Sequence, residues 1–158
     1  MVELDVKIEV GDLYDYMLMH AYHGAAGLLG SGVGAVAVLV GASRGEIIFL
    51  IAGLVLLLYL PWTLFVQSSK QVVSNPAFKE PLHYLLDEQG ITVSQNGESQ
   101  HQDWESMVKA VSTSRSIIVY TSKVNATILP KRMMGDKKTD VIEIISTHMP
   151  PKKVRIRN

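Results

Sequence analysis

Residues 24–43 read GAAGLLGSGVGAVAVLVGAS and residues 47–69 read IIFLIAGLVLLLYLPWTLFVQSS, and neither stretch contains a charged side chain. A helix of about 20 residues is about 30 Å long, which matches the hydrocarbon core of a bilayer. Only Arg44, Gly45 and Glu46 separate the two stretches. The sequence therefore predicts two membrane-spanning helices in a tight hairpin, with both of its ends on the same side of the membrane.

The basic residues near the ends of the predicted spans indicate how the hairpin is oriented. Lys7, Lys70 and Lys79 flank its outer ends, whereas the turn carries only Arg44. Because cytoplasmic segments are enriched in Lys and Arg, both termini are expected in the cytoplasm. Residues 12–70 are thus expected to form an interfacial helix and a two-span hairpin in the cytoplasmic membrane.

Small residues dominate the first span. Ala26, Gly30 and Gly34 follow one another at intervals of four residues, which places them along one helical face. In lipid, such residues allow two helix backbones to approach closely. We interpret this ridge as a helix-packing surface, either for the second span or for a second copy of the chain. A large side chain at Gly30 is expected to disrupt it.

Residues 1–11 are predicted to contain a β-strand. Apolar and charged residues alternate from Val2 to Val10, and this period of two is typical of a half-buried strand. The hairpin topology returns this strand to the side of the chain that follows the second span. We therefore expect it to join the sheet formed further along the chain.

A stripe of polar residues follows this strand. Asp12 is predicted to be the N-cap of a helix that continues into the first span, and it shares one helical face with His20 and His23. A carboxylate and two imidazoles can bind zinc or another divalent ion. The alternative is a polar stripe at the level of the lipid headgroups that faces water or the neighbouring domain.

Residues 75–149 are predicted to form a separate α+β domain. Runs rich in Val and Ile alternate with turn sequences such as Asn96-Gly97, which favours an antiparallel sheet. A final helix with an apolar stripe is expected after Asp136, which can cap it, and Pro150-Pro151 ends it. The predicted strands cover residues 82–86, 91–94, 98–102, 107–113, 117–122 and 126–129, and the N-terminal strand brings their number to seven.

Several motifs of this domain occur in the order known from a protein family. Residues 90–94 read GITVS, residues 119–122 read VYTS and residues 128–132 read ILPKR. Over residues 12–149 the chain resembles the YcxB-like family of small bacterial membrane proteins. The resemblance implies that residues 75–149 are similar to a pleckstrin-homology-like (PH-like) domain, a curved antiparallel sheet with a C-terminal helix. It implies no reaction and no catalytic residue.

Charge is balanced overall but concentrated locally. Lys and Arg number 15, as do Asp and Glu, which argues against a general nucleic-acid binder. Residues 150–158 form a basic tail, and basic residues near an anionic leaflet are attracted to it. The alternative is a solvated basic face. The candidate contacts with lipid or with a partner are Lys131, Arg132, Lys137, Lys138, Lys152 and Lys153.

The sequence contains no nucleophile elbow, phosphate loop or dinucleotide fingerprint, and it contains no cysteine. We therefore assign no catalytic residue, metal or cofactor. The leading hypothesis is a non-catalytic, membrane-anchored interaction or regulatory module that presents its domain at the inner leaflet to a protein partner or to anionic lipid. The alternative is a small membrane enzyme or metal-binding protein that uses the Asp/His stripe.

Overall fold

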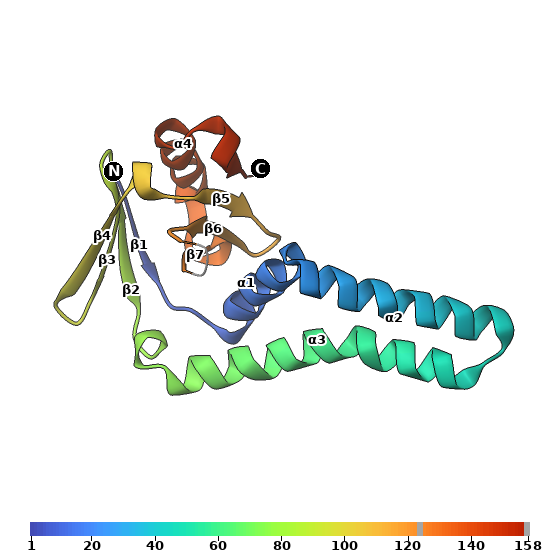
Figure 1. Cartoon of the computed structure of the whole chain (residues 1–158). Helices are drawn as coiled ribbons and strands as arrows, with labels where there is room; N and C mark the ends of the chain where they lie inside the picture. Colours follow the sequence, from blue (N-terminus) through green and yellow to red (C-terminus); the bar gives the residue numbers. More distant parts are fainter. Residues whose placement is uncertain (123–124, 157–158) are drawn as a thin grey trace.

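A computed structural model of the chain describes residues 1–122 and 125–156, apart from the side chain of Ala26. It consists of a β domain and a long helical hairpin that projects from it (Figure 1). The main elements are β1 Val2–Val6, α1 Val10–His23, α2 Ala25–Arg44, α3 Ile47–Ser74, β2 Leu82–Leu86, β3 Gly90–Gln95, β4 Glu98–Asp103, β5 Lys109–Ser112, β6 Ser116–Tyr120, β7 Ala126–Pro130, α4 Lys138–His148 and β8 Val154–Arg155. Short 3-10 turns lie at Pro76–Phe78, Trp104–Ser106, Lys131–Met133, Gly135–Lys137 and Pro151–Lys153.

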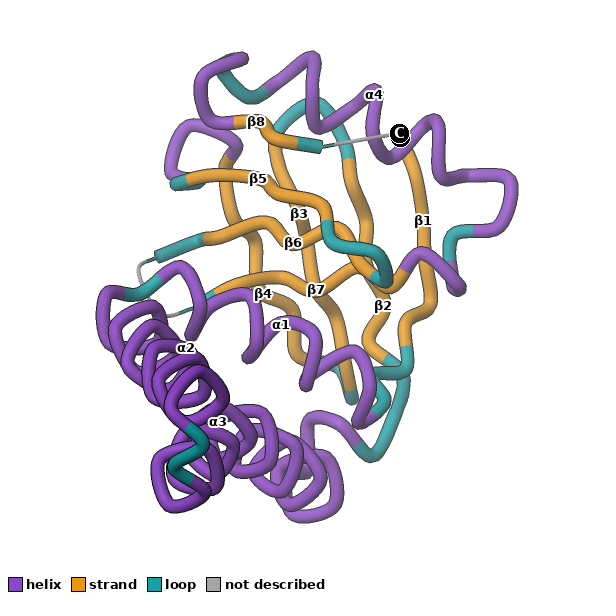
Figure 2. The backbone as a smooth tube through the Cα atoms, turned by 90° about the vertical axis from the view of Figure 1, so that its right-hand side faces the viewer, coloured by secondary structure: helices purple, strands orange, loops and turns teal. Residues whose placement is uncertain are grey.

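Two four-stranded sheets make up the β domain. The first has the order β1-β2-β3-β4 and is antiparallel throughout. The second has the order β7-β6-β5-β8, and only its β5–β8 pair is parallel. Figure 2 shows the strands of one sheet running across those of the other, with α4 at one end of the pair and α1 at the other. Fully buried side chains form the core, among them Leu86, Ile91, Met107, Ile117, Leu129, Val141, Ile145 and Met149.

The predicted union of the N-terminal strand with the sheet is confirmed. β1 pairs with β2 in a register that joins Val2 to Leu86 and Val6 to Leu82. Its apolar residues are buried and its charged residues are exposed, as the alternation in the sequence requires. The helical hairpin is therefore inserted between two neighbouring strands of one sheet.

The N-terminal strand is shorter than predicted, and the expected role of Asp12 as an N-cap is wrong. β1 ends at Val6, and α1 begins at Val10 with Glu9 as its N-cap. Asp12 occupies the third helical position, where its carboxylate accepts a hydrogen bond of 3.0 Å from the Glu9 backbone N–H. The two acidic residues form a reciprocal capping box, which satisfies backbone donors at the start of α1.

The six later strands and the final helix lie where the sequence predicts them, and none of their ends shifts by more than two residues. Asp136 does not cap α4, because the N-cap position falls on Lys137. The tail also differs from expectation. After the predicted stop at Pro150-Pro151, Val154 and Arg155 pair with β5 as β8 and extend the second sheet. The tail residues 157–158 lie outside the described part of the chain.

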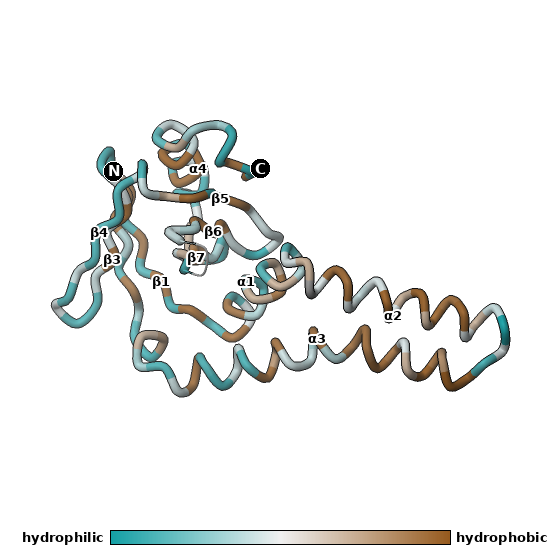
Figure 3. The backbone as a smooth tube through the Cα atoms, viewed as in Figure 1, coloured by the Kyte–Doolittle hydropathy of each residue, from teal (hydrophilic) through white to brown (hydrophobic). Residues whose placement is uncertain are grey.

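Helices α2 and α3, of 20 and 28 residues, are long and apolar enough to cross a membrane. They pack against each other. Figure 3 shows hydrophobic colours along much of both helices and a hydrophilic colour at the turn between them. Large exposed side chains on the two helices include Leu29, Val36, Leu39, Ile48, Leu58 and Trp62. The expected continuous helix from Asp12 into the first span is interrupted at Gly24, whose extended backbone separates α1 from α2.

Glycines do bring α2 and α3 together, but of the two glycines in the predicted ridge only Gly34 contacts α3. A Cβ atom at Gly34 would lie 3.2 Å from the backbone oxygen of Gly53, and one at Gly53 would lie 2.7 Å from that of Gly34. A Cβ atom at Gly41 would collide with the backbone of Leu50. At Gly30, by contrast, nothing lies within 4 Å, because this face of α2 points away from α3. The side chain of Ala26, the third predicted member, lies outside the described part of the chain.

Candidate functional site

A cleft of about 600 Å³ is lined by residues from both sheets, and we call it the inter-sheet cleft. β2, β3 and β4 form one wall, and β7 with the turn before it forms the other, while α1, the end of α3 and the turn after α3 contribute the rest. Its apolar lining includes Ile8, Leu13, Phe78, Leu82, Ile91, Val93 and Ile128, and its polar lining includes Gln71, Gln100, Gln102, Thr121, Asn125 and Thr127. Among the described residues, no Lys, Arg, Asp or Glu lines it.

The β3–β4 hairpin aims alternate side chains into this cleft. Asn96 and Gly97 both have positive φ angles, 53° and 83°, which is the geometry of a two-residue type I′ turn. The resulting register pairs Ile91 with Gln102, and it pairs Val93 with Gln100. Because directly paired residues lie on the same face of a sheet, the two glutamine amides stand beside the apolar lining. The site thus combines an apolar floor with neutral hydrogen-bonding groups, as small binding sites commonly do.

Asp12, His20 and His23, the residues of the polar stripe, are not gathered into one site. The Asp12 side chain is buried, at 1% exposure, and its Oδ2 atom lies 2.7 Å from Nη2 of Arg132. His20 stacks on Tyr120, with ring centroids 6.2 Å apart, and Nδ1 of His23 lies 2.7 Å from the backbone oxygen of Met19. Within residues 1–122 and 125–156, no three His, Cys, Asp or Glu side chains form a group suited to a metal ion.

Arg132 instead fastens the start of α1 to the turn after β7. Besides the Asp12 carboxylate, its guanidinium contacts Glu9 Oε1 at 3.3 Å and donates to the backbone oxygen of Lys7 at 2.8 Å. The hydrogen bond to Asp12, the largest cause, raises the pKa of Arg132. The sequence pattern assigns Arg132 to a basic surface and Asp12 to a polar stripe. Only the fold shows that they are partners.

Three more of the six basic candidates donate hydrogen bonds within the β domain. The Nζ atom of Lys131 donates to Ser112 Oγ at 3.1 Å, that of Lys137 to the backbone oxygen of Glu3 at 2.8 Å, and that of Lys153 to the backbone oxygen of Met107 at 2.9 Å. Burial, together with the nearby Lys138, lowers the pKa of Lys131. Of the six candidates, Lys138 is half-buried and Lys152 is exposed, and they remain the two that make no such contact in the described part of the chain.

An aromatic cluster, which the sequence did not reveal, connects α1 to the second sheet. Tyr16 of α1 lies 6.1 Å from Tyr120 of β6, measured between ring centroids, and Lys109 Nζ lies 4.4 Å from the centre of the Tyr120 ring. Burial, with a smaller effect of Tyr16, raises the pKa of Tyr120 to about 12. These contacts hold α1, and through it the hairpin, against the β domain.

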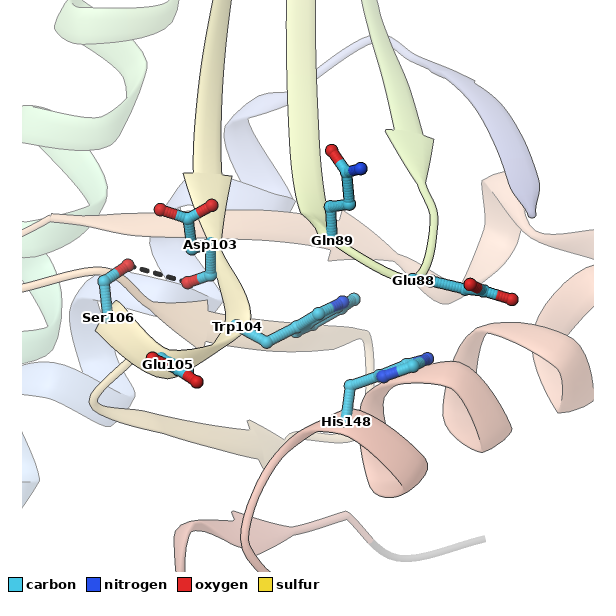
Figure 4. A pocket seen from close by; sticks show the side chains of 7 residues that line it. All are labelled: Glu88, Gln89, Asp103, Trp104, Glu105, Ser106 and His148. Atoms are coloured by element: carbon cyan, nitrogen blue, oxygen red, sulfur yellow. Dashed lines mark hydrogen bonds between the residues drawn. The ribbon is translucent and has the colours of Figure 1, made fainter.

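A second, more open hollow of about 750 Å³ lies at the end of β4 (Figure 4). The Trp104 ring forms its floor, donating from its indole nitrogen to the backbone oxygen of Asp87 at 2.9 Å. His148 of α4 stacks on this ring at 5.9 Å between centroids and 11° between planes. The carboxylates at its rim belong to Glu88, Asp103 and Glu105. The hollow is therefore an acidic surface next to a rigid aromatic pair.

Comparison with known proteins gives one match. Residues 86–145 match the family model described as YcxB-like protein. No curated protein and no solved structure matches the chain. The matched segment runs from the end of β2 into α4, so it covers the strands that form most of the inter-sheet cleft and all three motifs of the sequence resemblance. The chain is therefore similar to the YcxB-like family over residues 86–145.

Proposed function

We propose that the chain is a membrane-anchored interaction module without catalytic activity, in which α2 and α3 span the bilayer and the β domain binds a partner. The observation that carries this proposal is the insertion of an apolar hairpin between β1 and β2. Side chains such as Leu39 and Leu58 are about two-thirds exposed. Exposure of this apolar surface to water is unfavourable in free energy, whereas contact with lipid chains removes it from water. The proposal thus explains an apolar surface that the domain itself leaves uncovered.

The module has its β domain and both termini on the cytoplasmic side of a bacterial inner membrane. The excess of Lys7, Lys70 and Lys79 over Arg44 supports this orientation. The two crossed sheets with α4 at one end support the PH-like reading, with β1 supplied from before the hairpin and β2 from after it. Lipid is one partner, and an unidentified protein or an anionic headgroup near Lys138 and Lys152 is the other.

A regulatory or sensor role follows from the double connection between the hairpin and the sheet. A rotation of α2 against α3 would act on β1 through α1 and on β2 through the turn at Pro76–Phe78. Such a coupling requires a structural element with two arrangements, and both the hairpin and the β domain must shift the equilibrium between them. A second copy of the chain bound at the Gly30 face of α2 would bias such an element.

The rival function, an enzyme or metal-binding protein at the Asp/His stripe, gains no support from the geometry. The Asp12 carboxylate is bound to Arg132 and to the Glu9 backbone, and His20 is packed on Tyr120. Each of these contacts has a structural role in holding α1.

Alkaline carbonate extraction of membranes that contain the full chain tests the anchor. An integral hairpin stays in the membrane pellet after extraction at about pH 11 and is released only by detergent. Release of the chain into the carbonate supernatant would overturn the proposal, since a peripheral protein behaves in this way.

A further inference from the structure

The open edges of the two sheets differ in how they are covered. At β1, Lys137 donates to the backbone oxygen of Glu3, and Arg132 donates to that of Lys7 just beyond the strand. The second sheet ends on one side at β8, which is only two residues long. Basic side chains and very short strands are the usual means of blocking an edge. The remaining edges, β4 and β7, both border the inter-sheet cleft.

The outer edge of β4 presents unpaired backbone groups. In a two-residue hairpin the residues that flank the turn exchange both hydrogen bonds, so Glu98, Gln100 and Gln102 bond to β3. The N–H and C=O groups of Ser99 and His101 consequently point outward. In the described part of the chain no other backbone group bonds to them. His101 nevertheless lines the cleft, although its side chain bonds to Thr92 on the opposite face of the sheet.

The edge of β7 faces the cleft in the same way. Two hydrogen bonds at its ends show which residues of β7 bond to β6 and which point away from it. Thr121 N–H donates to the Asn125 oxygen, and Lys131 N–H donates to the Arg115 oxygen. They place the N–H and C=O groups of Ala126 and Ile128 on the side away from β6. Both residues line the cleft. Among the residues that the structure describes, no other backbone group bonds to them, so two strand edges with unpaired donors and acceptors border one cavity.

Charge around β4 limits what can lie along this edge. The cleft itself has a neutral lining among the described residues, but Glu98 begins β4, and Asp103 and Glu105 lie at its other end. No Lys or Arg occurs in β2, β3 or β4. A segment that is neutral in its middle and basic at its ends is complementary to this pattern.

We propose that the inter-sheet cleft binds an extended segment of a partner protein, which adds a strand to the outer edge of β4. The proposal rests on the function proposed above and names the partner segment. Main-chain hydrogen bonds to Ser99 and His101 supply affinity, as in other cases of strand addition. Alternate apolar side chains of the segment enter the cleft beside Gln100 and Gln102, which separate them from Ile91 and Val93 of β3. A basic residue at its end meets the acidic hollow next to Trp104.

A symmetric synthetic peptide, acetyl-KTVTVTVTK-amide with a fluorescent label, tests this with the full-length chain in detergent micelles. The expected result is saturable binding by fluorescence anisotropy, with slower hydrogen exchange at the amides of Ser99 and His101. A matched peptide with Glu in place of both Lys residues should bind at least tenfold more weakly. A third peptide, N-methylated through its central residues, should not bind, because it cannot pair with a strand edge.

Two variants isolate the backbone contribution on the protein side. His101→Pro removes an outward N–H without breaking a bond to β3, whereas His101→Ala removes the same imidazole contacts and keeps the N–H. Affinity for the Lys-ended peptide should fall at least tenfold in His101→Pro and less than threefold in His101→Ala. The N-methylated peptide, used with the unaltered chain, gives the same information if His101→Pro does not fold.

Absence of binding by the Lys-ended peptide would overturn the inference, and so would equal binding of the N-methylated peptide. Exchange protection at β1 or β8 instead of β4 would also overturn it. These outcomes leave the proposed membrane anchor intact, since carbonate extraction tests that anchor without any peptide.

Discussion

Nη2 of Arg132 lies 2.7 Å from the buried Oδ2 of Asp12, and this contact joins the turn after β7 to the first turn of α1. Glu9 and the backbone of Lys7 complete the set of acceptors around the guanidinium. α1 leads directly to the hairpin, while β7 borders the inter-sheet cleft. The Arg132–Asp12 pair is therefore a direct polar connection between the proposed anchor and the proposed binding site.

Replacement of Arg132 by Ala should destabilise the β domain. The Asp12 carboxylate would remain buried without its cation, which costs several kcal/mol in a fully buried pair. Because Arg132 is 34% exposed, water reaches the pair, and we expect a loss of about 2 kcal/mol. Urea unfolding in detergent, followed by the fluorescence of the buried Trp104, measures it. Lys138→Ala, a basic residue without such a contact, should change stability by less than about 0.5 kcal/mol.

Truncation of Leu4 tests whether β1 belongs to the core. Leu4 is buried at 4% exposure in the strand that pairs with β2, so Leu4→Ala should lower the free energy of unfolding by about 2–4 kcal/mol. Glu3→Ala, one position away on the exposed face, is the control and should have little effect. Equal stability of the two variants in urea would show that β1 contributes little to the domain.

Local patterns in the sequence were sufficient to predict strands β1 to β7. The alternation from Val2 to Val10 predicts a strand, and Asn96-Gly97 predicts a tight turn. Because the helical hairpin returns the chain to the same side, it also predicts that β1 lies near the strands that follow α3. β8 was missed because two residues after a Pro-Pro pair have too short a pattern to indicate a strand. The partners of β8 lie more than forty positions earlier, at Ala110 and Val111.

The candidate site could not be predicted from the sequence, because it depends on contacts between distant segments. Asp12 and Arg132 are separated by 120 positions, and no local pattern connects them. The inter-sheet cleft likewise requires the crossing of two sheets. The glycine spacing was also ambiguous: Gly30 and Gly34 are equally small, but only the rotation of α2 about its axis decides which of them meets α3.

Substitution of glycines should therefore affect the hairpin unequally. Gly53→Leu places a large side chain where even a Cβ atom would lie 2.7 Å from the Gly34 oxygen, so the helices must separate. We expect a decrease of at least 5 °C in the melting temperature in detergent. Gly30→Leu introduces the same side chain into open space and should leave the melting temperature of the monomer within about 2 °C. A larger decrease in melting temperature for Gly30→Leu than for Gly53→Leu would show that α2 presents its other face to α3.

Alkaline pH should destabilise the contact between α1 and the second sheet. Tyr ordinarily ionises near pH 10, and burial raises the pKa of Tyr120 to about 12 in the folded chain. The folded state thus disfavours the phenolate, so this stabilisation is fully present below about pH 10 and is lost as the pH rises towards 12. Tyr120→Phe should reduce the decline in unfolding free energy between pH 9.5 and 11.5. An unchanged decline would exclude Tyr120 as its source.

In the proposed function, α2 and α3 cross a membrane and hold the β domain on the cytoplasmic side. The chain contains no cysteine, so single labels can be placed at Ser43, near the hairpin turn, and at Ser74, at the end of α3. A membrane-impermeant maleimide is applied to intact bacterial cells that express each variant, and detergent-permeabilised cells serve as the control for reactivity. We expect labelling of Ser43→Cys in intact cells and labelling of Ser74→Cys only after permeabilisation. Labelling of Ser74→Cys but not of Ser43→Cys in intact cells would contradict the orientation, and protection of both until permeabilisation would contradict the membrane-spanning hairpin.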